Sequence, residues 1–315
     1  MSRKRTLRLL GFVGGVGALL LGVVVLGVPA PALAQKAPAA ALPAGYAGAE
    51  TCKGCHEDQF TKFEQTKMGR LFLKHPRNST ESLGCESCHG PGKAHADAGG
   101  GKGVGGIVSF AKDDTTPVER RNATCLGCHQ KSARLFWQGS PHESRDVACT
   151  SCHKLMETTS SRAQLARATV IETCGQCHLQ KRAQTMRSSH MPLREGKMTC
   201  TACHNPHGTV TPALLKENSA NETCFTCHAE KRRPFLWEHA PVVESCATCH
   251  DPHGSNHENL LKVAKPRLCQ QCHVESRHPT SPYSRREKQV LGRSCVSCHA
   301  NIHGSNHPSG HAFTR

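Results

Sequence analysis

NETCFTCHAEKRRPFLWEHAPVVESCATCH, residues 221–250, is the stretch of sequence that decides the fold. It contains the pattern Cys-x-x-Cys-His twice, and one further histidine, His239, lies between the two copies. The whole chain contains ten copies, which together use all 20 cysteines. Two thiols at this spacing can bond to the two vinyl groups of one haem, and the adjacent histidine can then bind its iron. The spacing therefore predicts covalently attached c-type haem at every copy.

The copies are numbered motif one to motif ten in chain order. The predicted thioether positions are Cys52, Cys55, Cys85, Cys88, Cys125, Cys128, Cys149, Cys152, Cys174, Cys177, Cys200, Cys203, Cys224, Cys227, Cys246, Cys249, Cys269, Cys272, Cys295 and Cys298. The predicted proximal iron ligands are His56, His89, His129, His153, His178, His204, His228, His250, His273 and His299. Structural zinc sites and disulfide frameworks do not require a histidine after every cysteine pair, so the complete use of cysteine disfavours both.

The composition agrees with an interior filled by cofactor. Only 4% of the residues are aromatic and 37% are hydrophobic, which is too little for a conventional core in a chain of 315 residues. Glycine, proline, asparagine and serine punctuate the segments between motifs. We therefore expect an elongated multihaem cytochrome c, mainly coil with short α-helices wrapped around ten closely packed haems and with negligible β-structure.

The first 34 residues have the character of a cleaved Sec signal peptide. A basic start precedes an apolar run from Leu9 to Val28, and Ala32-Leu33-Ala34 supplies a cleavage site. An uncleaved membrane anchor is the alternative, because the run is long enough to span a bilayer. Residues 35–48 are expected to be a linker. Export places the rest of the chain in the periplasm.

The formal net charge is +16, or +12 without the four basic signal residues. Such a charge raises the possibility of nucleic acid binding. Haem propionates are the better partners for these lysines and arginines, because a bis-histidine ferric haem carries roughly one net negative charge. We therefore expect no nucleic acid partner.

Twelve histidines lie outside the motifs and are candidates for distal iron ligands. Five precede the second motif of a two-motif repeat: His75, His142, His190, His239 and His278. Four follow it: His95, His207, His253 and His303. The repeat that ends at His153 lacks a histidine behind it. The tenth distal ligand would come from His257, His307 or His311. Methionine is the other possible ligand, but Met68, Met156, Met186, Met191 and Met198 follow no repeat.

Chain reach restricts the pairing of these histidines. His207 and His253 each lie three residues after a proximal histidine, so the two Cα atoms are at most about 11 Å apart. That span is too short to pass around a porphyrin edge. Both histidines are therefore expected to ligate a haem other than the neighbouring one.

The segments CHAEKRRPFLWEHAPVVESCATCHDPHG, LCQQCH, GRSCVSCH and IHGSNHPSG resemble the MtrA/DmsE-type periplasmic decahaem cytochromes, which include MtoA and PioA. The resemblance implies two pentahaem modules, here residues 49–190 and 191–315. It implies bis-histidine ligation with His307 as the tenth distal ligand, and His257 and His311 as spares. It also implies an electron conduit inside an MtrB-like outer-membrane β-barrel porin, with extracellular and periplasmic or inner-membrane cytochromes as partners.

The direction of electron flow stays open, since metal or dimethyl sulfoxide reduction exports electrons and Fe(II) oxidation imports them. A soluble periplasmic electron shuttle is the alternative function, because it would need the same ten motifs. A multihaem reductase is less favoured, because ten distal candidates leave no open coordination position. We expect an electron carrier and not an enzyme.

Overall fold

Each Cys-x-x-Cys-His motif forms one turn of helix. In all ten motifs the backbone N–H of the histidine donates to the carbonyl of the first cysteine, at 2.9–3.1 Å. This bond is the one that closes an α-helical turn, and it holds both thiols and the imidazole on one short, rigid unit. The computed structural model describes residues 42–111, 115–190, 192–274, 294–308 and 310–314.

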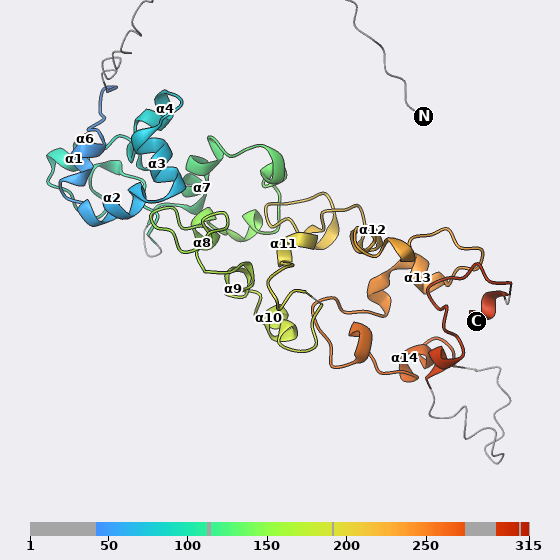
Figure 1. The fold of residues 1–315 in the computed structure, drawn as a ribbon. Helices are drawn as coiled ribbons and strands as arrows, with labels where there is room; N and C mark the ends of the chain where they lie inside the picture. The colour runs from blue at the N-terminus through green and yellow to red at the C-terminus, as the bar shows by residue number, and fades with distance from the viewer. Residues whose placement is uncertain (1–41, 112–114, 191, 275–293, 309, 315) are drawn as a thin grey trace, which may run out of the picture. The chain divides into compact units, whose positions relative to one another are not determined.

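Short helices joined by long loops make up the described part of the chain (Figure 1). The α-helices are α1 (Ala49–Lys53), α2 (Glu57–Glu64), α3 (Lys67–Lys74), α4 (Ser79–Ser82), α5 (Glu86–His89), α6 (Lys93–Asp97), α7 (Val118–Leu126), α8 (Cys149–Cys152), α9 (Val170–Cys174), α10 (Leu179–Thr185), α11 (Cys200–Cys203), α12 (Ala220–Phe225), α13 (Ala240–Glu244) and α14 (Arg267–Gln270). The 3-10 helices are η1 (Val104–Gly106), η2 (Ser132–Arg134), η3 (Glu143–Arg145), η4 (Pro212–Leu214), η5 (Ala229–Lys231), η6 (Cys246–Thr248), η7 (Glu258–Leu260), η9 (Cys295–Ser297) and η10 (Gly310–Ala312).

Regular β-structure is confined to isolated bridges in the described residues. Three bridges join the histidine of an even-numbered motif to a leucine further along the same loop: His153 to Leu165, His204 to Leu215, and His250 to Leu261. Two more join separate loops, between Ser188 and Ser255 and between Trp237 and Ser305. The expected fold class, short helices and coil with negligible β-structure, is confirmed.

Few apolar side chains are buried, as the composition predicts. The buried hydrophobic residues are scattered singly or in small groups, such as Phe60, Phe63 and Phe72 near the first motifs. Buried polar side chains are at least as frequent, and they hold the loops. Glu86 is 3% exposed and accepts hydrogen bonds from the backbone N–H groups of Ala47, Gly48 and Gly92 at 2.7–2.9 Å. This carboxylate ties the residues before motif one to motif two.

Residues 42–315 form one unit by their contacts, so the division into two pentahaem modules stays a prediction. The expected signal peptide and residues 35–41 of the expected linker lie outside the described residues. Within the described ranges, no helix has the length and apolar character needed to span a bilayer.

Candidate haem-binding site

The proximal histidines of the even-numbered motifs are all oriented in the same way. Each Nδ1 lies 2.5–2.9 Å from a backbone carbonyl in the loop that follows its motif. The acceptors are Val108 for His89, Ala163 for His153, Ala213 for His204, Asn259 for His250 and Ala312 for His299. A carbonyl can only accept, so Nδ1 carries the proton. The lone pair of Nε2 is thereby left for a metal.

Seven proximal histidines face a histidine from elsewhere in the chain. The ring centroids of each pair are 6.0–6.4 Å apart. The pairs, proximal histidine first, are His56 with His95, His153 with His207, His178 with His142, His204 with His253, His228 with His190, His250 with His303, and His273 with His239. In five pairs the ring planes are within 20° of parallel.

This spacing fits two imidazoles on opposite sides of one iron. An imidazole nitrogen binds a first-row metal at about 2 Å, so rings bound through their tips on opposite sides have centroids roughly 6 Å apart. The chemistry of the donors fits as well. Burial, and then the neighbouring His153, lower the pKa of His207 to about 4, which keeps that imidazole in the neutral form that metals bind.

Two proximal histidines, His89 and His129, have no such ring pair among the described residues. Of the expected distal ligands, His75 is likewise not in a described ring pair, His307 donates its backbone N–H to Ser305 at 3.0 Å, and His278 lies outside the described residues. For the rest, the fold brings together residues that sequence spacing could not match. His207 and His253 face a proximal histidine two motifs earlier, as the limit on chain reach requires.

The motifs follow one another in space in the order of the sequence. The first cysteines of consecutive odd and even motifs lie close enough to shift each other's pKa, and the neighbouring thiol of Cys85 lowers the pKa of Cys52 to about 7. These five pairs are Cys52 with Cys85, Cys125 with Cys149, Cys174 with Cys200, Cys224 with Cys246, and Cys269 with Cys295.

The second cysteines of the motifs provide the contacts between each even motif and the next odd motif. Burial and then the charge of Cys128 raise the pKa of Cys88, which makes motif three the neighbour of motif two. The same relation joins Cys152 to Cys177, Cys203 to Cys227, and Cys249 to Cys272. Alternating contacts therefore link all ten motifs into one unbranched succession.

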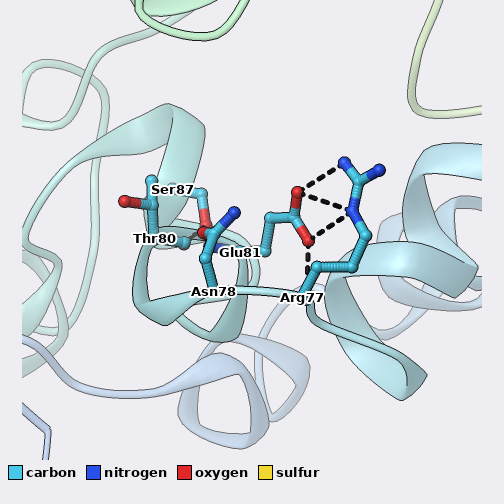
Figure 2. Close-up of polar contacts among 5 residues, drawn as sticks. All are labelled: Arg77, Asn78, Thr80, Glu81 and Ser87. Atoms are coloured by element: carbon cyan, nitrogen blue, oxygen red, sulfur yellow. Dashed lines mark hydrogen bonds and ion pairs between the residues drawn. The ribbon is translucent and has the colours of Figure 1, made fainter.

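An ion pair stiffens the segment between His75 and motif two (Figure 2). Arg77 Nη2 lies 2.6 Å from Oε1 of Glu81, and the backbone N–H of Arg77 donates to Oε2 at 2.7 Å. The Asn78 side chain caps α4 by accepting from the Glu81 N–H at 2.9 Å. Hydrogen bonding to Glu81, and then the charge of Glu81, raise the pKa of Arg77.

Two asparagines with a structural role in the site were not identified from the sequence. Asn122 and Asn221 are buried and connect an odd motif to the next even one. Asn122 Oδ1 accepts from the N–H of Cys149 at 2.8 Å, and Asn221 Oδ1 accepts from the N–H of Cys246 at 2.7 Å. Both stand three residues before a motif in the repeated segments NATC and NETC, which was the available signal.

Comparison with known families agrees with the motif chemistry. The doubled CXXCH motif family matches residues 190–233 and 239–278, and the NrfB-like family of c-type cytochrome proteins matches residues 85–177. The motifs bind c-type haem, and the protein is a multihaem electron-transfer cytochrome.

Individual relatives extend over more of the chain. The chain is 40% identical to the multihaem cytochrome MtrA of Shewanella baltica over 277 residues, which cover 85% of this chain and 81% of that protein. It is 23% identical over 222 residues to the C-type polyhaem cytochrome OmcB of Geobacter sulfurreducens, covering 59% of this chain and 26% of that protein. The chain therefore belongs to the MtrA family of multihaem cytochromes.

Proposed function

We propose that this protein is a ten-haem electron conduit that works inside an outer-membrane porin and connects the periplasm with the cell exterior. In this role it is an electron carrier and not an enzyme. Bound haem supplies the one-electron chemistry. The polypeptide orders the cofactors, supplies their axial ligands and excludes side reactions. Export by a cleaved Sec signal peptide is part of the proposal.

The unbranched succession of motifs is the observation that carries this function. Contacts between first cysteines alternate with contacts between second cysteines, so each motif has one neighbour on either side in chain order. An arrangement of this kind connects motif one to motif ten without gaps. Electron transfer from one end of the protein to the other needs such an arrangement, whereas catalysis at a single centre does not.

A porin partner would provide the lipid-facing apolar surface that this polar, loop-rich chain does not have. The described residues are mostly loops, and 20% of the sequence is charged. Loop backbone exposed to lipid would leave hydrogen-bonding groups unsatisfied, at a cost of several kcal/mol each. To conduct across an apolar layer about 30 Å thick, the chain would have to be enclosed by a closed barrel with a polar lumen.

Gentle extraction of outer membranes, followed by reconstitution in liposomes, tests the proposal. We expect the cytochrome to purify with a β-barrel protein and to pass electrons from an external reductant to a redox dye sealed inside. Liposomes that contain the barrel alone are the matched control.

Purification of the cytochrome without a barrel, together with no transfer across the liposome wall, would refute the conduit and support a soluble periplasmic shuttle. Rapid turnover of nitrite or sulfite by the purified protein would support a reductase instead. The direction of electron flow can be read in the same liposomes by exchanging the reductant and the dye between the two sides.

A further inference from the structure

Three of the loops behind even motifs begin with the same four-residue turn, which carries an expected distal ligand at its third position. The turns are NPHG (205–208), DPHG (251–254) and NIHG (301–304), and each starts directly after a proximal histidine. In all three, the glycine N–H donates to the carbonyl of the first residue, at 3.0–3.3 Å. The histidine of each turn faces a proximal histidine two motifs earlier. The three turns therefore share one backbone arrangement, and of the three only DPHG starts with a carboxylate.

The carboxylate of Asp251 contacts both the backbone and the ring of His253. Its Oδ1 accepts from the backbone N–H of His253 at 3.0 Å and lies 3.2 Å from the ring Nδ1. An ionised carboxylate can only accept, so Nδ1 carries the proton. The Nε2 lone pair is thereby left for the iron that His253 would share with His204, whose ring centroid is 6.1 Å away.

A second segment of the chain fixes the position of this carboxylate. Gln184 of α10, 67 positions earlier in the sequence, donates from Nε2 to Asp251 Oδ2 at 2.8 Å. The end of the turn is held by the same segment, because the N–H of Ser255 donates to the Ser188 carbonyl at 2.9 Å. Both carboxylate oxygens thus have partners, and the Asp251 side chain is 22% exposed. Its charge is therefore held beside the ring and is only partly screened by water.

The turn behind motif six has the same backbone but no carboxylate. Asn205 Oδ1 accepts from the His207 backbone N–H at 3.2 Å. The Asn205 amide donates to the carbonyls of Ala133 and Gly208, at 2.7 and 2.8 Å. The ring Nδ1 of His207 is buried and has no hydrogen-bond partner in the part of the chain that the structure describes. His207 and His253 therefore occupy the same position in the same turn, and they differ in the group that stands behind the ring.

Other ligand histidines have different surroundings at Nδ1. The even-numbered proximal histidines bond backbone carbonyls, and so do the distal candidates His95 and His142, at 3.1 and 2.7 Å. Glu230 also stands near a ligand ring, but its Oε1 is 3.7 Å from Nδ1 of His228, which is beyond hydrogen-bonding distance. The Glu230 side chain is 61% exposed, so water screens its charge.

A carboxylate behind a ligand imidazole changes the electronic properties of a haem iron. The hydrogen bond draws the Nδ1 proton toward the oxygen, which gives the ring imidazolate character and makes Nε2 a stronger electron donor. Stronger donation stabilises ferric iron relative to ferrous iron, and so does a negative charge nearby. Both effects act in the same direction and lower the reduction potential.

We propose that Asp251 is a positioning residue for the haem of motif six, and that through His253 it lowers the reduction potential of this haem below that of the haem of motif four. The ring pair of each haem is otherwise alike. The ring planes are 16° apart for motif six and 13° apart for motif four, and both proximal rings bond a backbone carbonyl at 2.8–2.9 Å. An electron that moves along the succession of motifs would therefore meet a step at motif six. The inference rests on haem ligation by these ring pairs and not on the porin.

Reciprocal substitutions in the fully haem-loaded protein test the proposal. Asp251→Asn keeps an acceptor for the His253 N–H and gives this turn the residue found at Asn205, so the main change is the loss of charge. We expect one haem in ten to become easier to reduce, with a shift of about tenfold in its ferric–ferrous equilibrium, or about 59 mV for a one-electron couple. Asn205→Asp should make one haem harder to reduce by a similar factor. Spectroelectrochemical titration of the wild type and the variants measures both shifts.

Glu230→Gln is the matched control, because it removes a carboxylate that stands near a ligand ring without a hydrogen bond to it. Its potentials should move clearly less than those of Asp251→Asn. Electron paramagnetic resonance of the ferric proteins gives a second readout, which a purely structural role would not produce. Asp251→Asn should stay low-spin at every haem and raise the largest g value of one of them, because its distal imidazole becomes a weaker donor.

Unchanged potentials in Asp251→Asn, or equal shifts in Asp251→Asn and Glu230→Gln, would overturn the proposal. A high-spin signal in Asp251→Asn would also overturn it, since the carboxylate would then hold His253 in place without tuning the iron. Where one of the reciprocal variants does not load haem, the other decides. Because the potentials are measured without a membrane, failure of the liposome experiment would leave this result standing.

Discussion

Asn122 and Asn221 each fix the distance between two haem motifs with one side chain. The Asn221 amide donates to the carbonyls of Val242 and Val243 at 3.0 and 3.1 Å, while its oxygen accepts from Cys246. Asn122 makes the same connection to Val147 and Cys149. Buried amides of this kind replace the apolar contacts that a chain with so few aromatic residues does not have.

Asn221→Ala should lower the free energy of unfolding by about 1 to 3 kcal/mol, because it leaves the half-buried Cys246 N–H and two carbonyls without their Asn221 partner. Asn218→Ala, at an exposed position, should have little effect. Denaturant unfolding followed by circular dichroism measures both. Equal stability of the two variants would show that the Asn221 bonds are replaced by water.

Glu81 makes stability depend on pH. Its hydrogen bonds with Arg77, first from the side chain and then from the backbone, lower the pKa of Glu81 below its ordinary value of 4.5. A group with a lowered pKa in the folded state contributes stability above its unfolded pKa, and this contribution is lost as the pH falls through the folded pKa.

Glu81→Gln should therefore melt at a lower temperature than the wild type at pH 7, and the difference should shrink below about pH 4. Glu217→Gln, at an exposed side chain, is the control. Thermal melts at several pH values give the comparison. A difference that stays constant at all pH values would rule out titration of Glu81 as its cause.

At the scale of elements, the loops behind the even motifs join one pair of motifs to the next. Gly208 and Gly254 follow His207 and His253, the expected distal ligands, in backbone conformations with φ of 113° and 142°. A Cβ atom on Gly208 would lie 1.8 Å from the Phe136 carbonyl oxygen, and one on Gly254 would lie 2.0 Å from that of Gln184. These glycines allow two backbones to approach closely, and the approach positions the histidine before each of them.

Gly208→Ala should displace the loop of residues 205–215 and move His207 away from His153. We expect a high-spin ferric signal from one haem in electron paramagnetic resonance. Gly139 also has a positive φ, of 75°, but the Cβ of Gly139→Ala would meet nothing within 4 Å. The control should cost only the strain of a left-handed residue, about 1 kcal/mol, and leave the spectrum unchanged. A low-spin spectrum in Gly208→Ala would show that the close approach does not hold the ligand.

At the scale of the whole molecule, the ordered succession of motifs would place the bound haems in the interior of the fold. Without the four basic residues of the proposed signal peptide, the formal charge is +12, which haem propionates would largely balance. Binding of the cofactors and folding are therefore expected to be coupled, because most of the apolar surface in the interior belongs to haem.

Intact-protein mass spectrometry should show the chain from Gln35 with ten haems of roughly 0.6 kDa each. The count follows from the complete use of 20 cysteines in motifs. A chain beginning at Met1 would show an uncleaved signal. Eight or fewer haems would contradict the count.

The sequence by itself determined the covalent chemistry, because Cys-x-x-Cys-His is a local unit whose helical turn closes between Cys52 and His56 without help from distant residues. It also limited the distal candidates, since their number and spacing can be counted. The pairing of distal with proximal histidines, in contrast, cannot be read from the sequence. His153 and His207 are 54 positions apart in the sequence, and only the fold brings their ring centroids to 6.1 Å.

The order of the motifs in space and the bridges made by the asparagines were likewise decided by the tertiary structure. Both depend on contacts between segments that are separated in the chain, such as the hydrogen bond from the Cys149 N–H to the Asn122 side chain. Such a bond uses on one side a backbone group that every residue carries, so residue spacing alone does not identify the partner.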